Sequence, residues 1–227
     1  MRRNALESLL EITKTVPLIT LGSHAVAQIF DLFMHSLDDY SVDNRGDIGS
    51  WIREVAAIGL AQLAILFSMH DEDHPTDSPI FTEQRCLQLF NGLIKQSVEK
   101  IDKMRDITAG LISFLLYNQE ESILATKACY SIQFNQQYSK FTLSQQYPFR
   151  PVVIPFVKWR EILESIYTRD HAIRGNIRYS AATSQTIFER TLPLFSLDEY
   201  RFSYLSGICT SIGGLSKQVV RNLELIE

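Results

Sequence analysis

Residues 48–68 read IGSWIREVAAIGLAQLAILFS and contain two charged side chains, Arg53 and Glu54. Apolar residues occupy nearly every position after Glu54, so this segment predicts a long, largely buried helix. The uncharged run from Val55 to His70 is shorter than the ~20 residues that a membrane-spanning helix needs. We therefore expect the core helix of a packed protein and no membrane span.

Helical periodicity continues on both sides of this segment, and no run of residues has a convincing strand pattern. Two polar stretches, 38–47 and 69–79, predict loops. Residues 133–151 are rich in Gln and Tyr and aperiodic, which predicts an irregular or mobile insertion. About ten helices follow from this pattern. Besides 48–68, they are expected up to Pro17, from Ser23, from Thr82 to near Lys100, over 104–117, 119–132, 156–167, 183–194 and 198–212, and from Ser216 onward.

An arginine followed by apolar residues occurs three times, at Arg3, Arg53 and Arg105. The intervals are 50 and 52 residues, slightly longer than the ~40–47 residues of HEAT and armadillo repeats. We therefore predict an all-α, HEAT/armadillo-like α-α superhelix, a right-handed solenoid. Residues 1–227 are expected to form a single repeat array that belongs to a longer solenoid.

Repeat-signature residues are commonly structural, because each helix pair buries its apolar face against its neighbours. We assign this role to Arg53, Arg105 and Trp51. The arginine is expected to pack its stem between repeats and to hydrogen-bond the preceding Asp47.

The net charge of −4 excludes a generally basic nucleic-acid-binding protein. Nine acidic and two basic side chains between Asp38 and Asp77 give that window a charge of −7 and leave +3 for the rest of the chain. Both acidic clusters lie in predicted loops, which commonly carry recognition sites when a rigid scaffold holds them. The alternative is that these loops are simply solvated.

No pattern in the sequence indicates catalysis. His70 and His74 bracket three acidic residues but have no well-placed third ligand, so we expect no metal site and no cofactor. Residues 212–217, IGGLSK, lack the spacing of a phosphate-binding loop. Arg45-Gly46-Asp47 is interpreted as a turn and a helix cap. An odd number of well-separated cysteines indicates reduced thiols in a cytosolic protein: Cys86, Cys129 and Cys209.

Two stretches are similar to motifs of the tubulin-folding cofactor D family, also called tubulin-specific chaperone D. Residues 39–54, DYSVDNRGDIGSWIRE, resemble that family's D-Y-x-x-D-x-R-G-D-V-G-x-W-V-R-E, with Ile48 as one conservative departure. Residues 204–221, YLSGICTSIGGLSKQVVR, resemble its L-x-G-L-x-x-S-V-G-G-L-T-E-S-T-x-R. Ile208, Ile212, Ser216 and Lys217 depart from the second motif, and residues 118–180 match weakly.

The resemblance implies the C-terminal portion of a cytoplasmic, cytoskeleton-associated chaperone. The residues themselves contain no catalytic set, so we expect this segment not to be an enzyme. Its implied partners are β-tubulin, the α/β-tubulin heterodimer, tubulin-folding cofactors C and E, and an Arf-like small GTPase. No nucleic acid is implied. Because the first motif lies in a loop, we assign partner contacts to five of its residues: Asp39, Tyr40, Asp43, Arg45 and Asp47.

Three alternatives stay open at the level of sequence. Arg45, Asp47 and Arg53 could instead form a polar network between repeats. The chain could be a generic HEAT-repeat adaptor or scaffold subunit with no tubulin role. It could also be an all-α hydrolase that uses the loop from His70 to His74.

Overall fold

The computed structural model describes residues 2–76, 78–118, 151–169 and 189–211. Seven α-helices and one 3-10 helix account for most of these residues, which confirms the all-α class; the superhelical arrangement of repeats stays a prediction. The helices are α1 (Arg2–Thr15), α2 (Leu18–Ser36), α3 (Gly49–Asp73), α4 (Glu83–Ser97), α5 (Asp102–Tyr117), α7 (Arg160–Ile166), η1 (Leu192–Ser196) and α10 (Asp198–Ser211).

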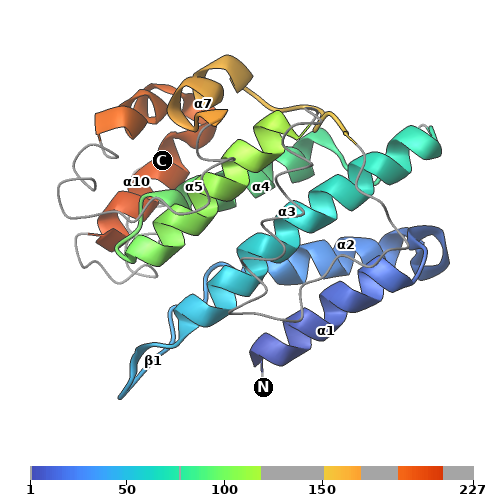
Figure 1. The fold of residues 1–227 in the computed structure, drawn as a ribbon, viewed down its shortest axis with the longest axis horizontal. Helices are drawn as coiled ribbons and strands as arrows, with labels where there is room; N and C mark the ends of the chain where they lie inside the picture. The colour runs from blue at the N-terminus through green and yellow to red at the C-terminus, as the bar shows by residue number, and fades with distance from the viewer. Residues whose placement is uncertain (1, 77, 119–150, 170–188, 212–227) are drawn as a thin grey trace.

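Helix α3 runs through the middle of the fold (Figure 1). On one side it packs against α1 and α2, and on the other against α4 and α5. The outer layer is α10, which packs on α4, together with η1, which packs on α10. This central position explains why α3 is apolar around its whole circumference.

Close packing between α2 and α3 depends on small residues in α3. Ala56 and Ala57 are fully buried, and the ring of Phe33 from α2 lies directly over Gly59. Among the described residues, α3 is also the one helix long and apolar enough to cross a membrane. Since 83% of its most apolar window is buried by the rest of the protein, this composition is that of a central core helix.

Helix α3 is longer than the sequence pattern predicts. The pattern predicts an end at Ser68, whereas α3 continues to Asp73. The physical reason is the Asp71 carboxylate, which accepts hydrogen bonds from the backbone N–H groups of Ile80 (2.9 Å) and Phe81 (2.7 Å). These hydrogen bonds connect the last, acidic turn of α3 to the segment that leads into α4.

Two other boundaries differ from the prediction. The helical hydrogen bonds of α2 begin at Leu18, with a kink at Gly22 (φ 76°), so the regular part starts near the predicted Ser23. The helix predicted over 156–167 is shorter, because Phe156 (φ 62°) and Trp159 (φ 53°) adopt left-handed conformations before α7. Such conformations are unfavourable for bulky residues and interrupt a helix.

The predicted helix start at Thr82 is confirmed, because its hydroxyl accepts a hydrogen bond from the N–H of Arg85 (3.2 Å). Cys86 is buried, whereas Cys209 is half-buried. Several predictions fall outside the described residues: the helix over 119–132, the insertion up to residue 150, most of the helix over 183–194, Cys129, and everything after 211.

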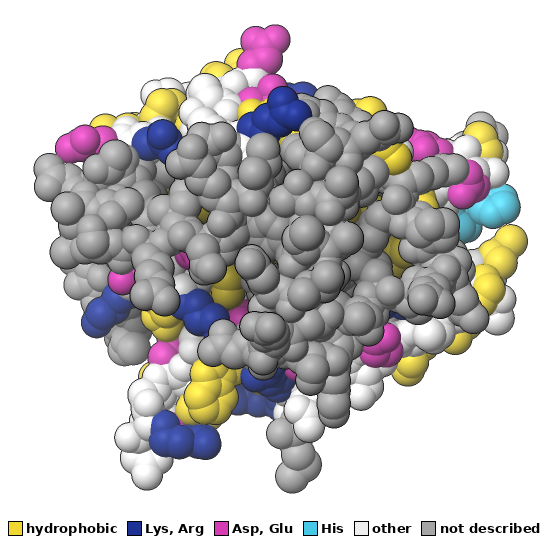
Figure 2. All heavy atoms as spheres, viewed as in Figure 1, with side chains coloured by type: hydrophobic (Ala, Val, Ile, Leu, Met, Phe, Trp, Pro, Cys, Tyr) yellow, Lys and Arg dark blue, Asp and Glu magenta, His cyan; other side chains and the backbone are white. Residues whose placement is uncertain are grey.

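The polar stretch 38–47 contains a small antiparallel hairpin, which corrects the expectation that the chain has no strands. Strand β1 (Val42–Asp43) pairs with β2 (Gly46–Asp47), with Val42 opposite Asp47. The hairpin projects away from the helices (Figure 1). In the space-filling view it forms the protrusion at the lower left, where basic and hydrophobic side chains are visible (Figure 2).

Asp106 on α5 should make stability pH-dependent. Burial raises the pKa of this carboxyl from 3.8 to about 6, and no hydrogen-bond or ion-pair partner for it occurs among the described residues. The folded state therefore holds the proton more tightly than the unfolded state, so its contribution to stability is lost as pH rises from about 4 to about 6.

Asp106→Asn is therefore expected to stabilise the protein by about 1 kcal/mol at about pH 7.5, and by much less at about pH 4.5. Urea unfolding at the two pH values measures this. Asp31→Asn, which removes an exposed carboxylate from α2, serves as the control. An equal gain at both pH values would show that ionisation is not the cause.

Candidate functional site

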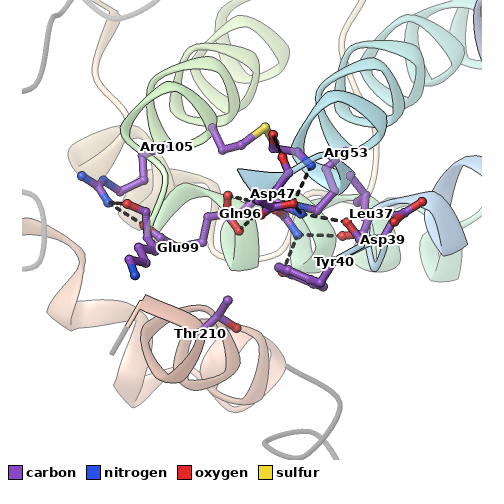
Figure 3. Close-up of polar contacts among 12 residues, drawn as sticks. Leu37, Asp39, Tyr40, Asp47, Arg53, Gln96, Glu99, Arg105 and Thr210 are labelled. Carbon is purple, nitrogen blue, oxygen red and sulfur yellow. Dashed lines mark hydrogen bonds and ion pairs between the residues drawn. The ribbon is translucent and has the colours of Figure 1, made fainter. Parts of the chain in front are cut away.

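Arg53, in the second turn of α3, has a fully buried side chain (0% exposed) at the base of the hairpin (Figure 3). Its two Nη groups donate to both carboxylate oxygens of Asp47 (3.2 and 3.0 Å), to Glu99 (3.0 and 3.2 Å) and to the carbonyl of Asp39 (2.8 Å). Its Nε donates to Gln96 (3.2 Å). One guanidinium thus joins the hairpin, α3 and the end of α4.

Tyr40 and Gln96 complete this cluster. The guanidinium carbon of Arg53 lies 4.2 Å from the centre of the Tyr40 ring, within cation–π range. The Gln96 amide donates to the Tyr40 hydroxyl (3.2 Å) and to the carbonyl of Leu37 (2.9 Å). Burial raises the pKa of Tyr40, so its hydroxyl stays neutral.

Glu99 is the most deeply buried carboxylate of the cluster, with 1% of its surface exposed. Burial raises its pKa above the ordinary value, and the ion pair with Arg53 opposes this only in part. Burial likewise disfavours the charge of Arg53, but hydrogen bonding to Asp47 and attraction to Glu99 raise the pKa of the guanidinium. Each charge is therefore tolerable only because the other is present.

The hairpin is held at both of its ends. The N–H of Gly49 donates to the carbonyl of Ser41 (2.9 Å), and the N–H of Ser50 donates to the Asp47 carboxylate (2.9 Å). A Cβ atom at position 49 would lie 2.0 Å from the carbonyl oxygen of Asp39, so only glycine permits this approach. Together with Arg53, these contacts fix the orientation of the projecting turn.

The acidic side chains around the hairpin are ion-paired, which changes the sequence-based view of an acidic surface. Each of the five carboxylates forms an ion pair, and three of the five bases come from outside residues 38–77. The pairs are Asp38–Lys95, Asp39–Arg2, Asp43–Arg45, Asp47–Arg53 and Glu54–Lys103. The local charge of −7 therefore does not correspond to a free acidic patch there.

The five residues assigned to partner contacts separate into two groups. Asp43 and Arg45 lie in the exposed turn, where Arg45 donates to Asp43 from Nη2 (2.6 Å), Nε (3.0 Å) and the backbone N–H (2.8 Å). Asp39, Tyr40 and Asp47 contact Arg53 at the base of the hairpin. Of the five, only Arg45 is exposed and the other four are half-buried. Contact of any of the five with a partner stays a prediction.

The three arginines of the repeat pattern have different surroundings. Arg53 joins the hairpin to two helices, whereas buried Arg105 donates to the carbonyls of Glu99 (2.6 Å) and Lys100 (2.9 Å), in the loop between α4 and α5. Arg3 is half-buried and pairs with Glu7 on its own helix (3.0 Å). The shared spacing therefore does not place these arginines in equivalent environments.

Comparison of the sequence with known proteins identifies a family. A family model described as "Tubulin folding cofactor D C terminal" matches residues 87–225, more than half of the chain. The chain belongs to this family. The resemblance inferred from the two sequence motifs is thereby confirmed.

Tubulin-specific chaperone D of Dictyostelium discoideum is 24% identical to this chain over 200 residues. The alignment covers 82% of the chain and 11% of that relative, so the chain spans a small part of the relative's length. No solved structure matches the chain. The family assignment therefore rests on sequence.

Sequence reasoning missed Gln96 and Glu99, which lie within the residues matched by the cofactor D family model. They are 43 and 46 positions from Arg53, Gln96 on α4 and Glu99 in the loop that follows it, and the sequence alone could not place either beside Arg53. The repeat pattern predicts a structural role for Trp51, yet 46% of its surface is exposed next to the hairpin. The signal available in the sequence was the family-like motif 39–54, which contains Trp51.

His70 and His74 lie at the end of α3, with ring centres 4.9 Å apart. No group of three or more His, Cys, Asp or Glu residues that could hold a metal ion occurs within 2–76, 78–118, 151–169 or 189–211.

Proposed function

We propose that this chain is a binding segment of a tubulin-folding cofactor that acts on tubulin after its release from the chaperonin. It would hold β-tubulin, or its co-chaperones, during assembly and disassembly of the heterodimer. Membership of the cofactor D family carries this proposal, and the printed name of the relative, tubulin-specific chaperone D, is consistent with it.

The proposed mode of action is that of a scaffold without catalytic chemistry. We propose that residues 1–227 form one HEAT-like array in a right-handed solenoid, the arrangement that gives such proteins extended binding surfaces. The partners would be β-tubulin, the α/β-tubulin heterodimer, cofactors C and E, and an Arf-like small GTPase. The proposed location is the cytoplasm, in association with the cytoskeleton.

We assign the contact to the hairpin, and within it to the half-buried Asp43 and the exposed Arg45. Asp39, Tyr40 and Asp47 act in this proposal by positioning the turn through Arg53. A projecting element that the fold holds in one orientation loses little entropy when it binds. A contact role also accounts for an exposed, charged turn within the motif that resembles the family.

Charge reversal in the turn tests this assignment. Arg45→Glu is expected to weaken binding of purified α/β-tubulin to the immobilised chain at least tenfold, about 1.4 kcal/mol. The double variant Asp43→Arg, Arg45→Asp restores an ion pair within the turn while exchanging its charges, and it should be equally weak. Surface plasmon resonance measures the affinity.

Thermal unfolding of the same variants is the control. We expect changes within about 0.5 kcal/mol, because the turn lies outside the buried cluster. Unchanged binding by both variants would refute the hairpin assignment. A large loss of stability would favour the alternative that these residues belong to a structural polar network. If the unaltered chain binds no tubulin, the generic adaptor becomes the better description.

A further inference from the structure

Arg45 and Trp51 form an exposed pair at the side of the hairpin. The guanidinium carbon of Arg45 lies 5.4 Å from the centre of the Trp51 ring, a distance typical of cation–π contacts. Both side chains are exposed, Trp51 by 46%. We call these two residues the Arg–Trp pair.

The Arg–Trp pair has hydrogen-bond donors for which the described part of the chain supplies no acceptor. Arg45 uses Nε and Nη2 on Asp43, and neither its Nη1 group nor the indole N–H of Trp51 has a hydrogen-bond acceptor among the described residues. The other tryptophan differs, because the indole N–H of Trp159 donates to Glu199 (2.8 Å). A ligand of the pair must therefore supply acceptors, since both groups are donors only.

Contacts on both residues position the pair. The Arg45 guanidinium forms an ion pair with Asp43 and lies over the Trp51 ring. The turn that carries Arg45 and the helix that carries Trp51 are joined by the contacts of Gly49 and Arg53. Arg and Trp are the residue types most enriched in the energetic centres of protein interfaces, and pre-organisation lowers the entropy cost of binding.

The electrostatic surroundings leave room for an anionic group at Arg45. The carboxylates nearest to the pair along the chain, Asp43, Asp47 and Glu54, each form an ion pair with a base. An incoming carboxylate would therefore meet the Nη1 donors of a guanidinium that it shares with Asp43, in the way that Arg53 is shared by Asp47 and Glu99. A charge-assisted hydrogen bond of this kind is stronger than one between neutral groups.

We propose that the Arg–Trp pair is the specificity-determining contact of the hairpin and binds an acidic segment of a partner protein. A carboxylate of the partner accepts hydrogen bonds from Arg45 Nη1, an acceptor of the same segment accepts the Trp51 N–H, and an apolar partner group packs on the indole face. This inference rests on the proposed function and specifies the chemistry of the partner surface.

Binding of α/β-tubulin to a series of variants of the 227-residue chain tests this chemistry. Trp51→Ala is expected to weaken binding at least tenfold. Trp51→Phe keeps an aromatic ring but lacks the N–H, and it should weaken binding about threefold to tenfold. Arg45→Gln should weaken binding at least tenfold and should reduce the salt dependence that the unaltered chain shows.

Val42→Ala is the matched control, because Val42 is also exposed on the hairpin (72%) but offers no donor. We expect its affinity to be unchanged, and circular dichroism to show the same helix content in all variants. Equal binding by Trp51→Ala and the unaltered chain would overturn the inference while leaving the proposed function intact. Loss of binding in Trp51→Ala without any effect of salt or of Arg45→Gln would overturn the acidic-partner chemistry. Failure of the unaltered chain to bind tubulin would overturn both proposals.

Discussion

Replacing Arg53 with methionine is expected to lower the free energy of unfolding by about 3–5 kcal/mol. Methionine fills a similar volume, so the loss comes mainly from charge. The Glu99 carboxylate would stay buried without its ion-pair partner, and Asp47 would lose two hydrogen bonds. Denaturant unfolding followed by circular dichroism measures the change.

This loss should depend on pH in a defined direction. Without Arg53, burial would raise the pKa of Glu99 further, so the folded variant would take up a proton that the unfolded chain releases. The destabilisation should therefore be smallest below the ordinary pKa of glutamate and should grow as pH rises toward neutrality. Adding Glu99→Gln to Arg53→Met should recover part of the stability and remove this pH dependence.

Arg3→Met is the matched control, because Arg3 occupies the corresponding position in the first copy of the repeat pattern. Its side chain is only partly buried and pairs with Glu7 on the same helix. We expect a loss of no more than about 1 kcal/mol. Similar losses for Arg3→Met and Arg53→Met would contradict the different environments that the structure gives these arginines.

Gly207→Ala is expected to destabilise the protein by about 1–3 kcal/mol. Gly207 lies on α10, where a Cβ atom would come within 2.2 Å of the Lys95 carbonyl oxygen and 2.6 Å of a methyl group of Val98. The carbonyl belongs to the backbone of α4, so a side-chain rotation cannot relieve the clash. The two helices would have to separate along their shared contact.

Gly110→Ala provides the control for Gly207→Ala within α5. Apart from its chain neighbours and the backbone of its own helix, no atom of the described residues lies within 4 Å of the position that its Cβ would occupy. Alanine favours the helical conformation over glycine, so this variant should gain about 0.5–1 kcal/mol. Opposite signs of the two changes in thermal unfolding would confirm the α4–α10 contact, and a gain for Gly207→Ala would contradict it.

The structure also gives a physical reason for one residue of the second motif, Gly207. At the level of sequence, this glycine is only one position of the family-like stretch 204–221. In the structure it lies where α10 approaches the backbone of α4 too closely for a Cβ atom. The sequence could not have supplied this reason, because Lys95 is more than a hundred positions away.

Helix boundaries could be predicted where the signal was local. Thr82 caps α4 through its own hydroxyl, and the apolar run after Glu54 forms the core of α3. The end of α3 was predicted too early because the groups that Asp71 accepts from, at Ile80 and Phe81, belong to the following segment. A polar stretch predicts a loop unless its long-range partners are known.

The sequence by itself determined the helical class, the buried character of α3 and the family, since periodicity, hydrophobicity and motifs are properties of neighbouring residues. The tertiary structure decided what the charged residues do. Only folding brings Lys95, Lys103 and Arg2 to the acids around the hairpin, and Glu99 and Gln96 to Arg53. Electrostatic energies depend on distances of a few ångströms, which spacing along the chain does not fix. The apparent acidic loop is therefore an anchored hairpin with ion-paired carboxylates, and the exposed Arg45 on its turn lies beside the exposed Trp51 of α3.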